Sequence, residues 1–374
     1  ETLGLLAPHT EMVRLFLNGK DRGIHVFVEQ PSETTLRNAN LMPGDIYRGE
    51  IVGKDAFTIN RVATKKMLFD STSLWDKVAI NNHYDPESLA PLEKLLELIK
   101  GHKEEQSQAL LSEIMDMEAW GRFSAFETLA STKHFSDSHN WRIYFDPWRS
   151  KFYPFVWDPA GWKWQDKLFT IVPSKLHELM FRNGDFLRAR NAAFEDFFRS
   201  GKDTYFLKLV SDTVQMMETE IKNDPFLRPG NVAKVSRGMD ELRQQISEVF
   251  TLTKQRWSAG GNSHTKFHYH ANTLDLLVGG NRPVQKLRMM FDEKLNTSIT
   301  AKVNFSTPGG RKVVELSSRT TGADLNAIIF HVSLLPDLEI EIETKGPRII
   351  GGQLKTSPGY YQISLTGLDS DSRL

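Results

Sequence analysis

The most unusual part of this sequence lies between residues 134 and 164, which read His134-Phe-Ser-Asp-Ser-His-Asn-Trp-Arg-Ile-Tyr-Phe-Asp-Pro-Trp-Arg-Ser-Lys-Phe-Tyr-Pro-Phe-Val-Trp-Asp-Pro-Ala-Gly-Trp-Lys-Trp164. Five of the eight tryptophans of the chain fall in its last 24 positions. Two apolar-rich runs, Trp141–Phe145 and Phe152–Trp157, are typical of short strands, and Asp146-Pro147 opens the turn between them. We expect a two-stranded ribbon here, preceded by a polar loop.

Helical periodicity lies on both sides of this ribbon. Apolar residues at steps of three and four predict helices over 85–100, 107–115, 116–129, 174–182, 186–200, 203–222 and 229–257. Asp85-Pro86-Glu87 is typical of a helix start, with a capping carboxylate and a proline in the first turn. The middle of the chain is therefore expected to be a helical body that surrounds the ribbon.

The amino-terminal part predicts a hairpin over residues 11–30. Asn18-Gly19 is a strong turn signal between two apolar-rich strands, and Gly23 is expected to close the turn. Alternation places Val13, Leu15 and Leu17 on one apolar face, whereas the opposite face is mixed and expected to be only partly covered. Residues 31–84 are expected to be loop with a few short strands or turns.

The sequence pattern changes from helical to strand-like after about residue 262. Alternating and β-branched runs predict strands over 299–305, 312–316, 327–332, 338–343 and 360–365, with glycine-rich turns between them. We interpret this as a small all-β module, a sandwich in the simplest case. The fold class is thus α+β, with regions expected at 1–84, 85–260 and 261–374.

Composition excludes several classes of protein. The chain has 47 basic and 47 acidic residues, so its net charge gives no support for a nucleic-acid partner. It has no cysteine, which excludes disulfides, thiolate metal sites and a cysteine nucleophile. No apolar run of about 18 residues predicts a transmembrane segment.

Asp137, Asn140 and Asp158 are the candidate chemical residues. Helix, polar loop, two-stranded ribbon and Asp-x-x-Gly follow one another as they do around a kinase catalytic loop. Mg²⁺ prefers oxygen ligands and is held by one or two side chains with phosphate and water, which these residue types could supply. Each motif taken singly is also compatible with an ordinary turn or strand end; the hypothesis rests on their order.

Four segments resemble the CotH-type kinases, a family named from bacterial spore-coat proteins. The matching segments are Leu17–Gln30, Asp116–Trp120, Ser136–Pro147 and Phe152–Asp158, and the resemblance covers about residues 1–258. The family has an atypical protein-kinase fold and transfers phosphate from ATP to proteins. The resemblance therefore implies a partial small lobe and a helical large lobe ahead of the all-β module.

The resemblance also implies a role for each position. Asp137 would be the catalytic-loop aspartate, and Asn140 and Asp158 would be ligands of Mg²⁺. Val28, Glu29 and Gln30 would form the hinge that meets the adenine of ATP. A protein substrate and an extracellular or cell-surface location are expected from the same resemblance.

Two departures from the family pattern favour an alternative. Ala160 stands where a second acidic residue is usual, and the phosphate-binding strands with their Lys–Glu pair are expected upstream of residue 1, in a missing segment or a second chain. The alternative function is a catalytically inactive, pseudokinase-like scaffold of a surface assembly.

Two weaker hypotheses concern other residues. His264, His268 and His270 have a spacing that could place three imidazoles near a metal, although a solvent-exposed or otherwise satisfied role is the simpler interpretation. The tryptophans, with carboxylates such as Asp146 and Asp158, could suggest a carbohydrate-active protein. Nothing in their spacing fixes the separation of about 5–10 Å that glycoside hydrolysis requires.

Overall fold

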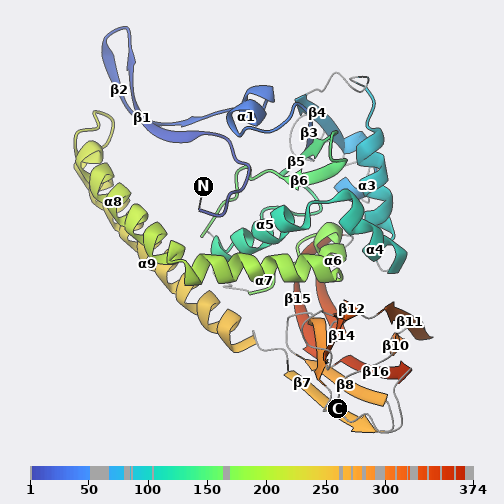
Figure 1. The fold of residues 1–374 in the computed structure, drawn as a ribbon. Coiled ribbons are helices and arrows are strands. Elements are labelled where there is room, and N and C mark those ends of the chain that lie inside the picture. Colours follow the sequence, from blue (N-terminus) through green and yellow to red (C-terminus); the bar gives the residue numbers. More distant parts are fainter. Residues whose placement is uncertain are drawn as a thin grey trace. The chain divides into compact units, whose positions relative to one another are not determined.

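Figure 1 shows the chain as a computed structural model. It describes residues 2–50, 67–79, 85, 87–102, 105–162 and 169–260, together with the strands between residues 264 and 366. The chain divides into two compact units: Glu1–Trp257 with Ile342–Gln353, and Ser258–Glu341 with Leu354–Leu374. Elements of each unit are described separately below.

An antiparallel four-stranded sheet forms the centre of the first unit. Its strands are β3 (Asp45–Gly49), β4 (Trp75–Ala79), β5 (Trp141–Asp146) and β6 (Lys151–Pro154), in the order β4-β3-β5-β6. All six residues of β5 are buried, because it pairs on both sides. The predicted ribbon is confirmed, although its second strand ends at Pro154, three residues before the expected Trp157. Long-range pairing with β3 could not be deduced from the local pattern.

The helices lie close to where the periodicity predicts them, except for Glu33–Asn38, which falls in a part of the chain that was expected to be loop with short strands or turns. In chain order they are α1 (Glu33–Asn38), α3 (Ala90–Lys100), α4 (Glu105–Ile114), α5 (Met117–Leu129), α6 (Lys175–Phe181), α7 (Gly184–Arg199), α8 (Lys202–Lys222) and α9 (Pro229–Gly260), and two short 3-10 turns cover Leu68–Asp70 and Thr72–Leu74. The expected start of α3 at Asp85 was wrong. Asp85 instead accepts a hydrogen bond from Glu87 N–H in a turn, and the helix begins at Ala90 with Pro91 in its first turn.

Close packing of α5 on α7 builds the helical core (Figure 1). A Cβ added at Gly121 would lie 2.5 Å from the backbone nitrogen of Arg190, so only glycine lets the two helices approach this closely. Arg190 itself is buried and donates to the hydroxyl oxygens of Ser124 and Thr128 on α5. Burial lowers the pKa of Arg190 to about 9. A charged group is thus enclosed between helices whose remaining contact is largely apolar.

The hairpin of β1 (Thr10–Leu17) and β2 (Lys20–Val28) is confirmed, with Asn18 and Gly19 as its two-residue turn at φ 51° and 72°. Gly23 does not close that turn as expected. It lies within β2 at φ 80°, where a Cβ would meet the carboxylate of Asp224 at 2.4 Å. That carboxylate accepts a hydrogen bond from Ile24 N–H and so joins the hairpin to the end of α8.

The apolar faces of the hairpin are more open than expected. Leu15 is 41% exposed and Leu17 is 52% exposed, on the face that was predicted to be the covered one. Residues of the opposite strand are similarly exposed, including Val26 and Phe27. A two-stranded sheet has too little area to cover itself, and polar contacts from Arg14 to Glu220 and to the carbonyl of Asn223 provide much of its attachment.

The carboxyl-terminal part is composed of strands, as predicted. They are β7 (His264–His270), β8 (Thr273–Gly279), β9 (Val284–Met290), β10 (Thr300–Thr307), β11 (Gly310–Ser317), β12 (Arg319–Thr320), β13 (Ala327–Leu334), β14 (Asp337–Lys345), β15 (Arg348–Ser357) and β16 (Gly359–Thr366). They form sheets in the orders β11-β10-β16-β8-β7, β12-β13-β9 and β14-β15. The arrangement of these sheets as a sandwich stays a prediction, as do the domain boundaries. Among the described residues, no helix is sufficiently long and apolar to span a membrane.

Candidate functional site

Trp141 anchors the loop that carries the candidate residues. Its indole is 1% exposed and packs within a cluster of aromatic rings from α5, the first 3-10 turn and the loop itself: Phe69, Trp120, Phe123 and Phe135. The indole N–H donates to the carbonyl of Ser136 at 2.7 Å. Burial of so large a side chain fixes the start of β5 and, with it, the preceding polar loop.

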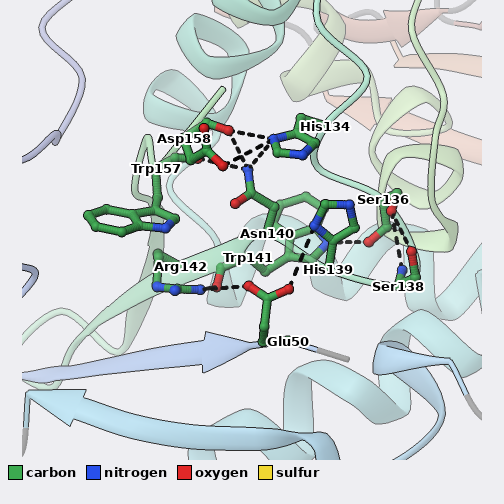
Figure 2. A network of polar contacts seen from close by, with 10 residues as sticks. All are labelled: Glu50, His134, Ser136, Ser138, His139, Asn140, Trp141, Arg142, Trp157 and Asp158. Atoms are coloured by element: carbon green, nitrogen blue, oxygen red, sulfur yellow. Dashed lines mark hydrogen bonds and ion pairs between the residues drawn. The ribbon is translucent and has the colours of Figure 1, made fainter. Parts of the chain in front are cut away.

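Asn140 joins this loop to the segment that follows β6 (Figure 2). Its amide Nδ2 donates to the backbone carbonyls of Trp157 and Asp158, both at 2.8 Å. Two carbonyl acceptors determine which end of the amide is nitrogen, so the side-chain oxygen of Asn140 is the end turned away from that segment. The backbone of Asn140 is left-handed at φ 76°. Two residues 18 positions apart are therefore brought together, as the sequence hypothesis requires.

Asp158 presents its carboxylate to solvent from a strained segment. Its side chain is 66% exposed, and His134 Nδ1 lies 3.8 Å from its Oδ2. Asp158, Ala160 and Trp162 all have positive φ, at 40°, 46° and 56°, a conformation that non-glycine residues rarely adopt. Trp162 fastens the segment by donating its backbone N–H to Ala130 and its indole N–H to Leu129. Such strain persists only where neighbouring contacts over-determine the backbone.

Asp137 occupies a quite different environment. It is 0% exposed, and its Oδ1 accepts a hydrogen bond of 3.0 Å from the backbone N–H of Lys175, the first residue of α6. Its own carbonyl accepts from Leu68 N–H at 2.8 Å. The second carboxylate oxygen, Oδ2, is buried without a hydrogen-bond partner among the described residues. Burial is the main cause that raises the pKa of Asp137 to about 6, against the partial compensation of Lys175.

A second polar network lies beside Asn140, and sequence reasoning missed it (Figure 2). Glu50, at the end of β3, is 3.6 Å from both His139 Nδ1 and Arg142 Nη1. Arg142 also lies over the ring of Trp157, 5.3 Å from its centroid. Burial lowers the pKa of Arg142 to about 10, although Glu50 opposes the shift. His139 and Arg142 lie in the unusual segment 134–164. No local signal pointed to Glu50, because the pairing of β3 with β5 decides that it approaches these two residues.

The three proposed hinge residues lie at the end of β2. Val28 is the last residue of the strand and is 40% exposed. Glu29 makes two hydrogen bonds with His9. The Glu29 N–H donates to the His9 carbonyl at 2.9 Å, and the His9 N–H donates to Glu29 Oε2 at 3.0 Å. Gln30 is exposed. The strand thus ends where the hypothesis requires, and the role of these residues stays a prediction.

The side-chain oxygens of Asn140 and Asp158 are of the type that binds Mg²⁺, but they do not surround a metal ion by themselves. Among the described residues, no three His, Asp or Glu side chains gather to hold a metal ion by themselves. Asn140 and Asp158 would offer two oxygens to the ion. A site of few protein ligands fits Mg²⁺, which usually keeps water and phosphate in its shell.

The three histidines of the metal hypothesis lie on β7. His268 and His270 are two positions apart on one strand, paired with Asp275 and Thr273 of β8. Their side chains lie outside the described residues, so the three-histidine hypothesis stays untested.

Comparison with known proteins gives one finding. The family model described as CotH kinase protein matches residues 1–272, which include the hairpin, the four-stranded sheet, every helix named above and all six candidate site residues. No curated protein matches the chain.

Proposed function

This chain belongs to the CotH kinase family, and from that premise we propose that it transfers a phosphoryl group from Mg-ATP to a hydroxyl group of a protein. The observation that carries the proposal is the contact between Asn140 and the backbone of Asp158. This contact brings Asp158, which follows the ribbon, close to the loop of Asn140, which precedes the ribbon. Metal-assisted phosphoryl transfer requires such an approach of the two metal ligands. The kinase-like division into a partial small lobe and a helical large lobe belongs to the same proposal.

In this mechanism, Asp158 and Asn140 are the residues that would hold Mg²⁺. The metal supplies neutralisation of the negative charge on the phosphates when it is bound. Asp158 suits this role because its carboxylate faces solvent. Asn140 suits it because its amide nitrogen is occupied by two carbonyls, which leaves its oxygen end for a ligand.

Asp137 would orient the acceptor hydroxyl and accept its proton. Its Oδ1 is held by Lys175 N–H, whereas the buried Oδ2 has no hydrogen-bond partner among the described residues and would be the atom that meets the acceptor hydroxyl. With a pKa of about 6, most of this carboxyl is ionised at pH 7 and still close to the range that favours proton transfer. We expect phosphate transfer to rise as the pH increases through about 6.

The adenine site and the acceptor complete the proposed function. Val28, Glu29 and Gln30 would offer backbone groups to the adenine of ATP, since β2 ends at that point. A protein of a surface or extracellular assembly is proposed as the acceptor, with the carboxyl-terminal strands as its partner-binding module.

Substitution of the two aspartates tests the proposal. Asp137→Asn and Asp158→Asn should each reduce phosphate transfer from labelled ATP by at least about 100-fold, since each removes a charge at the reacting centre. Asp212→Asn is the matched control, because Asp212 is an exposed aspartate on α8 paired only with Lys208 among the described contacts. Transfer by both aspartate variants at the rate of the control would contradict the proposal.

A catalytically inactive scaffold is the second candidate. Two observations favour it: Asp137 is fully buried, and Ala160 replaces a possible metal carboxylate. Thermal unfolding with Mg-ATP separates the candidates, because a ligand at about 100 times its dissociation constant adds about 2.7 kcal/mol to the free energy of unfolding. No shift of the melting temperature across a wide range of Mg-ATP concentrations would favour the scaffold.

A further inference from the structure

A continuous chain of hydrogen bonds runs through the core beneath Asp137. Ser174 Oγ lies 2.7 Å from His177 Nδ1, and His177 Nε2 lies 2.9 Å from Glu127 Oε1. All three residues are buried: Ser174 and Glu127 are 0% exposed, as is His177. They come from α5, from α6 and from the residue that precedes α6, and none of them takes part in the mechanism proposed above.

The donors and acceptors of this chain define one protonation pattern. Ser174 caps α6, and its Oγ accepts the backbone N–H of His177. Its hydroxyl proton is then available to His177 Nδ1, which leaves the imidazole proton on Nε2, facing Glu127. Each ring nitrogen of His177 therefore has a partner, and the imidazole is fixed in orientation.

The hydrogen-bonded chain ends at Ser174, one residue before the backbone group that holds the candidate catalytic aspartate. Ser174 precedes Lys175, whose backbone N–H donates to Asp137 Oδ1, and the Lys175 ammonium donates to Asp70 Oδ1 at 2.8 Å. The ring of His177 also lies 5.5 Å from that of Trp141, whose indole N–H holds the carbonyl of Ser136, the residue before Asp137. His177 thus contacts supports on both sides of Asp137.

We propose that Ser174, His177 and Glu127 are positioning residues that fix the direction of the Asp137 carboxylate. This inference rests on the proposed function, in which Asp137 receives the acceptor proton. The cap at Ser174 orients the first turn of α6, so that Lys175 N–H points at Oδ1 and Oδ2 remains free for a substrate hydroxyl. Both ring nitrogens of His177 are bonded in this chain, which gives a more specific geometry than apolar packing of the same volume because each hydrogen bond has a preferred direction.

Two neighbouring helix caps provide a matched comparison. Asn183 caps α7 as Ser174 caps α6: it is 6% exposed, and its Oδ1 accepts Phe186 N–H at 3.0 Å. Ser174→Ala and Asn183→Ala each remove one buried cap, but only the first is connected to Asp137. Amide hydrogen exchange, resolved by residue in the full-length chain, reports the local effect directly. We expect faster amide exchange at Lys175 in Ser174→Ala and at Phe186 in Asn183→Ala. Exchange at Phe186 in Ser174→Ala, and at Lys175 in Asn183→Ala, should change little.

Kinetics then separate a positioning role from a structural one. Ser174→Ala should lower kcat by about tenfold or more with the KM for Mg-ATP unchanged, because a displaced base weakens the reacting geometry and not substrate binding. Asn183→Ala should stay within about twofold of the unmodified protein in both constants. If Ser174→Ala does not fold, Glu127→Gln, which conserves volume, replaces it and is compared by the same two measurements.

Asp137→Asn in the same assays makes the outcomes distinguishable. In one outcome, Asp137→Asn is inactive, but Ser174→Ala and Asn183→Ala have the same kcat and the same exchange rate at Lys175. This outcome overturns the positioning role and leaves the proposed function standing. Full activity of Asp137→Asn overturns both, because a residue that does not react needs no positioning. The inference is supported only when Asp137→Asn is inactive and Ser174→Ala alone loses kcat and Lys175 protection.

Discussion

Asp137 and Asp158 lie on either side of one ribbon, yet their surroundings differ in almost every respect. Asp137 is fully buried, with a carbonyl and a carboxylate oxygen held by the backbone of two distant segments. Asp158 has a 66% exposed side chain on a strained backbone. The candidate site thus has two halves. Asp137 with Lys175, His177 and Glu127 forms the Asp137 half, and Asp158 with His134 and Asn140 forms the Asp158 half.

The difference corresponds to two chemical requirements. A group that exchanges a proton near neutral pH benefits from desolvation, which brings the pKa of a carboxyl toward the working pH. A metal ligand must instead stay charged and accessible to a hydrated ion, so an exposed carboxylate suits it. Burial and exposure therefore divide the two proposed roles between residues of the same type.

The largest expected difference between the halves concerns their histidines. His177→Ala removes the partner of a fully buried Glu127 and should lower the free energy of unfolding by about 3–5 kcal/mol, the usual effect of breaking a buried pair. His134→Ala, on the Asp158 half, should cost about 1 kcal/mol, because it removes a contact with the exposed Asp158 carboxylate and one hydrogen-bonding position next to the Asp158 carbonyl, without leaving a buried carboxylate unpaired. Urea unfolding of the two variants measures both values, and equal losses would contradict the contrast.

The next effect is the pH dependence of stability contributed by Asp137. Its pKa of about 6 in the folded state lies above the ordinary value of an aspartate, so the folded protein keeps a proton that the unfolded chain has already lost. This contribution to stability is present below about pH 4 and is lost as the pH rises through about 6, a total of about 3 kcal/mol.

Asp137→Asn removes that dependence. Its free energy of unfolding, relative to the unmodified protein, should therefore rise by about 2 kcal/mol between pH 4 and pH 7. Chemical denaturation at a series of pH values checks this. A difference that does not change with pH would mean that the carboxyl of Asp137 is not desolvated in the folded protein.

The smallest effect concerns backbone strain on the Asp158 half. Ala160→Gly should raise the free energy of unfolding by up to about 1 kcal/mol, because glycine adopts the φ of 46° at Ala160 without steric cost. Ala130→Gly is the control: Ala130 has ordinary helical geometry at φ −84°, so glycine there should destabilise the protein. Thermal denaturation of both variants gives the comparison, and destabilisation by both would show that φ at Ala160 is not a source of strain.

Local sequence signals predicted much of the fold around the site. Asn18-Gly19 determined the hairpin turn, and Asp116 was placed correctly at the start of α5, whose first turn it caps through Ala119 N–H. These signals succeeded because a turn or a cap depends on residues within a few positions of each other. The order of loop, ribbon and acid also led us to expect Asp137, Asn140 and Asp158 around one cation; the structure joins Asn140 to the backbone of Asp158, and the shared cation stays a prediction.

Other features had no local signal. Nothing in the sequence around Glu50 links it to Arg142, since their approach depends on the register of β3 against β5. Glu127 and His177 each lie on an ordinary amphipathic pattern, and only packing of α5 and α6 brings them within 2.9 Å. The exposure of the hairpin was predicted wrongly for the same reason, because alternation defines a face without saying what covers it.

The sequence by itself thus indicated most elements of this protein, the family to which it belongs and the residues that we propose for phosphoryl transfer. Only the tertiary structure decided that Asp137 is enclosed and bonded to α6, whereas Asp158 faces water beside Asn140. The physical reason is that desolvation and hydrogen bonding at a carboxylate depend on every segment that packs around it. Those segments are far apart in the chain and meet only in the folded protein.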